Sequence, residues 1–190
     1  MPVRAPALLV AALIAALALG CSSNNNGANG GGAANQSAGT PQSAARPVVA
    51  GTPVDGIPCE TSEQLTYHVH AHLTIIANGQ NVPVPAFIGI PGRCFYWLHT
   101  HDTSGVIHIE APSQRAFTLG QFFDIWGQRL STTQVLGFTA DAQHSVQFFV
   151  DGQPYTGDPR QIPLGAHTLI TIEYGPPFPA PPSYTFPAGL

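Results

Sequence analysis

The segment YHVHAHLTI (residues 67–75) carries a histidine at every second position. Successive side chains of a β-strand point to opposite faces, so we predict a strand over residues 67–76 with its histidines on one face. Alternate side chains lie about 6.8 Å apart along a strand, whereas a Zn–N bond measures only about 2.0–2.1 Å. Two neighbours among His68, His70 and His72 can therefore share one ion, but all three cannot easily do so. The opposite, apolar face holds Val69, Ala71, Leu73 and Ile75.

A second segment, LHTHDTSGVIHIE (residues 98–110), supplies three more histidines. Asp102–Gly105 is typical of a turn, which predicts a hairpin between strands Phe95–His101 and Val106–Glu110. Its register would place His99 opposite His108, with Cβ atoms about 4.5–5.5 Å apart. By the same register His101 faces Val106 and Glu110 faces Trp97. We therefore expect His99, His101, His108 and Glu110 to share one face.

Six of the eight histidines lie on these two segments. As cations they would repel one another, and as neutral rings each needs a hydrogen-bond partner, so a bound metal ion is the favoured explanation. A polar histidine face without metal is the alternative. The predicted ligands are His68, His70, His72, His99, His101 and His108, with Asp102 and Glu110 as further ligands or as partners that orient the imidazoles. His144 and His167 are expected to be ordinary polar residues.

The residue types limit which metal this site would prefer. The only methionine, Met1, belongs to the predicted signal peptide, which excludes a thioether site for Cu(I). Imidazole with carboxylate suits Zn, Cu(II), Fe or Ni, and the sequence does not choose among these ions.

Two turn dipeptides and one capping pattern complete the predicted fold. Asn78-Gly79 predicts a hairpin whose return strand, residues 81–90, contains two prolines and so lies at an edge. Asp151-Gly152 lies between predicted paired strands at residues 145–150 and 168–174. Thr118 and Gln121 form a capping-box pattern before an amphipathic helix at about residues 119–130. We predict an α+β fold of antiparallel β hairpins with one amphipathic helix; a small β-sandwich or barrel is the alternative.

The first fifty residues do not resemble a folded domain. Residues 1–20 combine an early positive charge with an apolar run that is typical of a signal peptide. The following Cys21 completes a pattern that resembles the bacterial lipobox, which predicts a lipidated cysteine; ordinary secretion is the alternative. Residues 21–50 are rich in Gly, Asn and Ser and predict a disordered tether. Residues 51–175 would form the domain and residues 176–190 a proline-rich tail.

The cysteines and the net charge limit the compartment and the kind of partner that we expect for the chain. Cys59 and Cys94 are the two cysteines left after Cys21, and two cysteines in an exported chain predict a disulfide. The odd spacing of Cys94 from His99 and His101 places it off the histidine face, which favours a disulfide over a metal ligand. The formal net charge of −4 argues against a nucleic-acid partner.

The chain resembles a family of exported bacterial and archaeal proteins and lipoproteins over about residues 67–130. The motifs that carry the resemblance are HVHAHLTI, an Asn-Gly turn with a return strand ending in IGI, LHTHDTSGVIHIEAP and FTLGQFFDIWGQ. The resemblance implies that the six histidines and Asp102–Gly105 belong to one unit. It implies no particular activity.

Two functions therefore follow from the sequence. The first is a metal-binding lipoprotein anchored by its lipid to a membrane outside the cytoplasm. The alternative is an extracytoplasmic metalloenzyme, hydrolytic or oxidative, in which Glu110 or Asp102 acts as acid or base. No substrate and no protein partner is predicted.

Overall fold

The structure is a computed structural model and describes residues 50–190. The predicted signal peptide, the predicted lipidation site Cys21 and the tether up to residue 49 lie outside the described residues. Within residues 50–190, no helix has the length and apolar character needed to cross a membrane.

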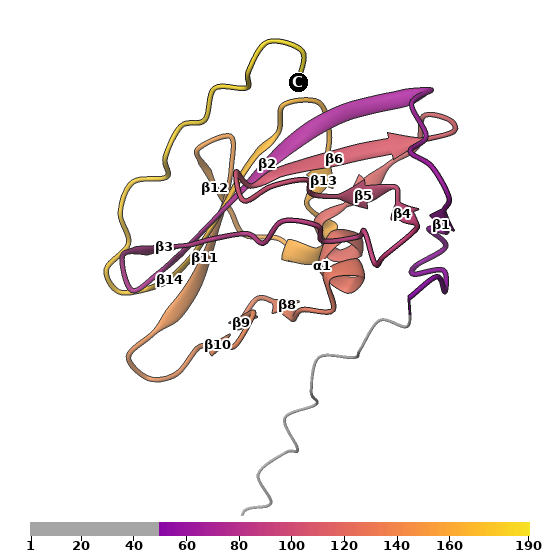
Figure 1. Cartoon of the computed structure of the whole chain (residues 1–190). Coiled ribbons are helices and arrows are strands. Elements are labelled where there is room, and N and C mark those ends of the chain that lie inside the picture. Colours follow the sequence, from indigo (N-terminus) through magenta and orange to yellow (C-terminus); the bar gives the residue numbers. More distant parts are fainter. Residues whose placement is uncertain (1–49) are drawn as a thin grey trace, which may run out of the picture. The chain divides into compact units, whose positions relative to one another are not determined.

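A mixed seven-stranded sheet is the framework of the domain (Figure 1). Its strand order is β12-β11-β14-β2-β6-β5, and the short β3 pairs with the end of β2. The bounds of these strands are β2 Tyr67–Ala77, β3 Gln80–Val82, β5 Leu98–His99, β6 Val106–Ala111, β11 Ser145–Val150, β12 Gln153–Tyr155 and β14 Leu169–Gly175.

Two hairpins form at the predicted dipeptides. Asn78-Gly79 connects β2 with β3, and Asp151-Gly152 connects β11 with β12. In both pairs the first residue has φ 51°, and the glycines have φ 75° and 74°. A type I′ turn requires positive φ at both positions, which explains why Asn-Gly and Asp-Gly occur here.

The strand β14 joins the two halves of the sheet. It pairs antiparallel with β11, as predicted, and also parallel with β2, from Leu169 opposite His72 to Tyr174 opposite Ala77. The prediction of antiparallel hairpins only is therefore wrong, because β14 and β2 are parallel. Parallel strands cannot be connected by a tight turn, and no local sequence signal marks their pairing.

The single α-helix of the described residues, α1, spans Leu119–Trp126 and is shorter than predicted. It begins at the predicted capping box, in which Thr118 and Gln121 bond reciprocally. It ends at Gly127, which has φ 70° and caps the last turn, so that Leu130 belongs to strand β8 instead.

The predicted α+β class is wrong, because the described residues are mainly β. One eight-residue helix accompanies the large sheet, two two-stranded sheets and one three-stranded sheet. A closed barrel is not formed among residues 50–190. The small elements are β1 Cys59–Glu60, β4 Phe95–Tyr96, β7 Phe117–Thr118, β8 Leu130–Ser131, β9 Gln134–Val135, β10 Phe138–Thr139, β13 Pro163–Leu164 and the 3₁₀ turn η1 Pro159–Gln161.

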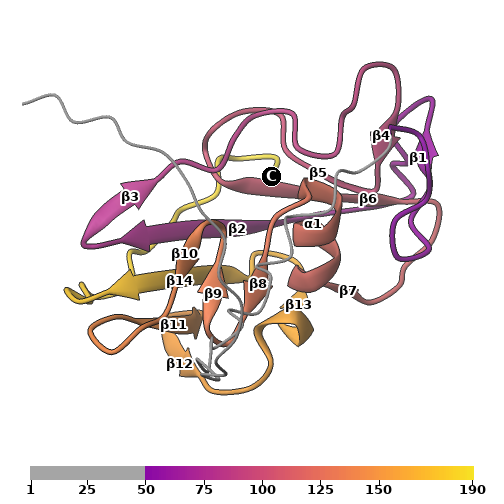
Figure 2. The same ribbon diagram turned by 90° about the horizontal axis from the view of Figure 1, so that it is seen from below.

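The core lies on the apolar face of β2, and α1 packs into it (Figure 2). Ala71, Leu73 and Ile75 are at most 1% exposed, and the helix contributes the buried Phe122 and Phe123. This is the face that the alternation of residues 67–75 predicts to be apolar. Because the core occupies one face of β2, the histidines occupy the other.

A disulfide joins Cys59 and Cys94, as predicted. It connects β1 to the residue before β4, and these two short strands also pair with each other. The bond therefore holds residues 57–66 beside β4 and β5. The proline-rich residues 176–190 contain no strand or helix and run back toward the start of β14 (Figure 1).

Candidate metal centre

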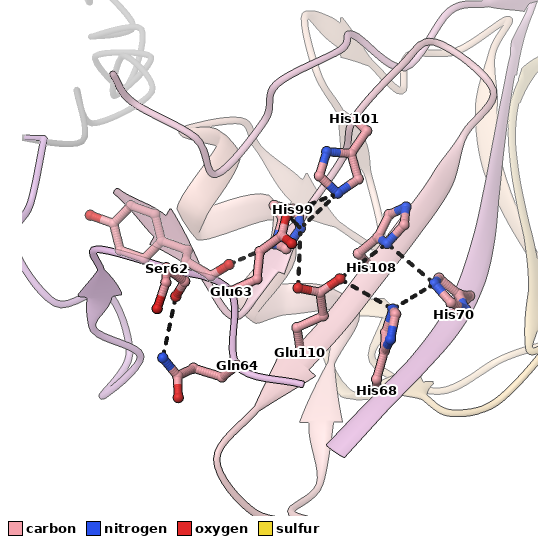
Figure 3. Close-up of polar contacts among 10 residues, drawn as sticks. Ser62, Glu63, Gln64, His68, His70, His99, His101, His108 and Glu110 are labelled. Carbon is pink, nitrogen blue, oxygen red and sulfur yellow. Dashed lines mark hydrogen bonds and ion pairs between the residues drawn. The ribbon is translucent and has the colours of Figure 1, made fainter. Parts of the chain in front are cut away.

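The histidine faces of three adjacent strands lie in register. His70 on β2 is opposite His108 on β6, and His108 is opposite His99 on β5. Two residues back along β2, on the same face, His68 is opposite Glu110. Side chains at paired positions share a face of the sheet, and Figure 3 shows these side chains converging from β2 and β6.

The first set of close contacts forms a closed ring of four donor atoms. Nε2 of His70 lies 3.0 Å from Nε2 of His68 and 3.2 Å from Nδ1 of His108. Oε1 of Glu110 lies 3.2 Å from Nε2 of His68 and 3.3 Å from Nδ1 of His108.

The second set surrounds His99. Its Nε2 lies 3.3 Å from Nε2 of His101 and 3.8 Å from Oε2 of Glu110. Oε1 of Glu63 lies 3.3 Å from Nε2 of His101 and 3.9 Å from Nε2 of His99. Figure 3 shows Glu63 approaching the two imidazoles from outside the sheet.

Glu63 was not among the predicted ligands. This residue lies in the loop between β1 and β2, where no strand periodicity points to the histidine face. The Cys59–Cys94 disulfide holds this loop beside β4 and β5, which brings the carboxylate to the site. The only signal in the sequence is that an acidic residue lies four positions after a predicted disulfide cysteine.

His101 reaches the site although it lies beyond the end of β5. The predicted strand over residues 95–101 is divided into β4 and β5, and its ladder with β6 ends at the pair His99–His108. The expected pairing of His101 with Val106 is wrong, because β5 and β6 pair only at Leu98–Ile109 and His99–His108.

The orientation of His99 leaves a lone pair directed into the site. Its Nδ1 donates a hydrogen bond of 2.8 Å to the carbonyl of Tyr96. Because a neutral imidazole carries one proton, Nε2 is then unprotonated and can coordinate a cation. Bonds of this kind typically orient the histidine ligands of metal sites.

Glu110 is a buried carboxylate with too few partners. Its side chain is 3% exposed, and Oε2 accepts no hydrogen bond. Burial alone would raise the pKa of Glu110, but the hydrogen bond from His108 and the nearby His99 and His68 outweigh it and lower this pKa. A buried anion of this kind needs a compensating positive charge.

The buried histidines resist taking up protons. Burial, with the nearby His108 and His68, lowers the pKa of His70 to about 4. Burial lowers the pKa of His99 to about 4 as well, against the opposing effect of its bond to Tyr96. At neutral pH both rings are therefore neutral, which is the state that binds metal.

The spacing of the donor atoms suits a four-coordinate ion. Around an ion with bonds of about 2.0–2.1 Å, tetrahedral ligands are about 3.3 Å apart and square-planar ligands about 2.9 Å. The four contacts of the first ring, at 3.0–3.3 Å, fall in this range. One proton can satisfy one such contact, whereas one cation can be shared by several of these donors, of which those of His68, His70 and His108 all lie within 4.8 Å of one another. The residues therefore fit a transition-metal ion.

His72 is not part of either set. Its Nε2 donates to the carbonyl of Ser104 at 2.9 Å, and the ring stacks on Tyr184 of the tail with centroids 3.7 Å apart. Burial lowers the pKa of His72. A Cβ at Gly105 would lie 2.5 Å from the carbonyl oxygen of Leu73, so the chain passes close to this strand only with glycine. His72 anchors the 102–105 turn and the tail rather than facing the other histidines.

Asp102 also lies outside the cluster. Its Oδ1 accepts a hydrogen bond of 2.8 Å from the amide of Ser104. Hydrogen bonds from the side chain and then from the amide of Ser104 lower the pKa of Asp102. It shapes the turn between His101 and Val106.

The two remaining histidines have other partners. His144 pairs with Asp141 at 2.9 Å and stacks on Tyr174. The backbone amide of His167 donates to the carbonyl of His70, and its ring stacks on Phe186.

The cluster is buried on one side and open on the other. The side chain of His99 is fully buried, while those of His68 and His101 are 36% and 39% exposed. An ion could therefore enter from the side of His68 and His101 without unfolding of the core.

No protein family, no curated protein and no solved structure matches this chain. The family resemblance of residues 67–130 therefore stays a prediction.

The stability of the metal-free chain should fall in mild acid. The pKa of His70 and of His99 is about 4 in the folded chain, against about 6.5 in the unfolded chain. The unfolded state therefore takes up protons first as the pH falls. The stability that the neutral rings of His70 and His99 contribute should be fully present above about pH 6.5. The free energy of unfolding should decrease by roughly 1–2 kcal/mol per residue between pH 7 and pH 5.

Urea unfolding of the metal-stripped chain at the two pH values measures this decrease. The double variant His70→Asn, His99→Asn keeps a donor near Nδ1 and lacks the titrating ring, so its decrease should be smaller. An equal decrease in the parent and the double variant would show that these two residues do not cause it.

Proposed function

We propose that this protein binds a transition-metal ion outside the cytoplasm while a lipid on Cys21 anchors it to a membrane. The ion would be Zn, Cu(II), Fe or Ni, held by histidines from the β2 strand and from the β5–β6 hairpin. Scavenging, buffering or delivery of the ion are the roles that such a tethered domain could fill.

The observation that carries the metal-binding part is the unpaired oxygen of Glu110 among imidazole nitrogens. A buried carboxylate is stable only with a positive partner. The imidazole nearest to this oxygen is that of His99 at 3.8 Å, whose pKa of about 4 disfavours protonation. A metal cation supplies the charge without a proton. Zn, Cu(II), Fe and Ni all accept imidazole together with carboxylate.

The anchoring part rests on sequence and on the disulfide. Disulfides form and persist in oxidising compartments, so the Cys59–Cys94 bond is compatible with export. The apolar run before Cys21 and the Gly/Asn/Ser-rich segment after it support a lipid anchor with a tether. An exported protein would meet its metal ion outside the cytoplasm, so the predicted signal peptide is consistent with the proposed metal-binding function.

A metalloenzyme is the second candidate, and one observation favours it. The partial exposure of His68 and His101 leaves a solvent-facing side on which an ion could hold water or substrate. Glu63, which is 33% exposed beside His101, could then act as acid or base.

Removal of single histidines should distinguish the ligands from the other imidazoles. His99→Ala and His108→Ala should each weaken metal binding by more than about 100-fold, because loss of only an outer partner of a ligand typically costs about 10–100-fold. His144→Ala should change the affinity little, because that ring pairs with Asp141. His72→Ala should have a mild effect. Competition titrations of Zn(II) and Cu(II) into the metal-stripped full chain measure these affinities. Unchanged affinity after loss of both His99 and His108 would exclude this cluster as the site.

Cys21→Ala should release the protein from the membrane or block its maturation. Acyl chains on this residue would supply the membrane affinity, at about 0.8 kcal/mol for each buried CH₂. Fractionation of cells into membrane and soluble parts, followed by detection of the chain, measures the effect. A membrane fraction equal to that of the parent would contradict the lipid anchor.

An exchangeable coordination position should separate the two candidate functions. Azide added to the Co(II)- or Cu(II)-loaded chain should change its visible spectrum if one position holds water, as an enzyme requires. A spectrum that azide leaves unchanged would indicate a closed site and favour storage or delivery. His72→Ala is a suitable control, because His72 lies outside both sets of donors.

A further inference from the structure

We infer that the cluster is a dinuclear centre in which Glu110 bridges two metal ions. One ion lies among His68, His70, His108 and Oε1 of Glu110, and the second among His99, His101, Glu63 and Oε2 of Glu110. This inference rests on the proposed metal-binding function and adds the number of ions, the bridging residue and the ligand Glu63.

The two oxygens of Glu110 point to different sets of donors. Oε1 lies 3.2 Å from His68 and 3.3 Å from His108, whereas Oε2 lies 3.8 Å from His99 (Figure 3). A carboxylate that bound one ion through one oxygen would leave the other oxygen free for a hydrogen bond. Here Oε2 is buried and accepts none. A second cation beside His99 would remove this unsatisfied group.

The donors are too many and too widely spread for one ion. Five imidazoles and two carboxylates reach the site, while Zn(II) in protein sites is almost always four-coordinate. Donors around one ion lie no more than about 4.2 Å apart, which is twice the bond length. The donor atoms instead form two overlapping groups, within each of which all atoms lie within 4.8 Å of one another: His68, His70 and His108 in one, and His99, His101, His108 and Glu110 in the other. Glu110 also reaches His68 of the first group through Oε1, and Glu63 reaches His99 and His101 of the second.

The contacts divide these donors into two sets of four. In the first, four neighbouring distances are 3.0–3.3 Å, so this set is the tighter. In the second, the distances are 3.3–3.9 Å and involve two imidazoles and two carboxylates. Fewer imidazoles and longer distances make the second position the weaker one.

The charges also favour a shared carboxylate. Two divalent ions repel each other strongly at the separation of about 3.5–4 Å that is typical of two-metal sites. Glu110 lies between the two positions and is 3% exposed, so its charge is little screened by water and acts on both ions. Glu63 adds a second negative charge at the outer position.

The stoichiometry of Zn(II) bound to the metal-stripped full chain, measured by native mass spectrometry, tests the inference. Two ions per chain are expected, with the second bound more weakly. Glu63→Gln should reduce the bound Zn(II) to one ion per chain, because the outer set loses a charged ligand. Glu60→Gln is the matched control: Glu60 lies on the neighbouring strand β1, takes part in none of these contacts and should leave two ions bound.

Magnetic coupling tests whether the two ions share one site. In the Cu(II)-loaded chain, two neighbouring ions should give a coupled electron paramagnetic resonance spectrum of reduced intensity. Glu63→Gln should convert it to the full signal of one isolated ion. Because Glu63 is partly exposed, this variant keeps the test valid even if a substitution of the buried Glu110 prevents folding.

The outcomes separate the two proposals. One Zn(II) per chain in the parent would overturn the dinuclear centre and leave the metal-binding function intact. No bound Zn(II) and no bound Cu(II) would overturn both. Two uncoupled Cu(II) signals would place the second ion elsewhere, and two ions retained by Glu63→Gln with parental affinity would remove Glu63 from the site; either result overturns the inference as stated.

Discussion

The common register of the antiparallel strands β2, β6 and β5 is the constraint on which the rest of the site depends. It places His70, His108 and His99 side by side and His68 next to Glu110. A shift of one residue in β2 would turn its histidines into the core and its apolar residues outward. The packing of Leu73 and Ile75 in the core therefore holds the imidazoles in place, and the energy of that packing is independent of any metal.

Two further features support this register: the disulfide lies beside β5, and the parallel strand β14 pairs with β2. The Cys59–Cys94 bond closes residues 57–66 over β4 and β5 and brings Glu63 to His101. The strand β14 pairs with the second half of β2, while β6 pairs with the first half on the opposite edge. His70 and His99 are buried, so these histidines lie in a partly dry environment in which electrostatic interactions are strong.

This environment explains why the cluster resembles a metal site rather than a polar surface. In water, imidazoles and a carboxylate have ample partners. Here burial lowers the pKa of His70 and His99, and Oε2 of Glu110 has no hydrogen bond. The same chain places His72 four residues from His68, yet the carbonyl of Ser104 and the ring of Tyr184 take up its side chain. A place on the same face of β2 is thus not enough to bring a histidine into the cluster. The elements that pack beside each histidine decide which of them contact one another.

The sequence alone determined the features that depend on neighbours along the chain. Alternation in residues 67–75 defined the two faces of β2, the turn at 102–105 defined the pairing of His99 with His108, and Thr118 with Gln121 defined the start of α1. Only the tertiary structure decided the pairing of β2 with β6, the parallel pairing with β14 and the approach of Glu63. These contacts join segments that no turn connects, and their free energy comes from burial and packing across the whole sheet, which leaves no local pattern in the residues themselves.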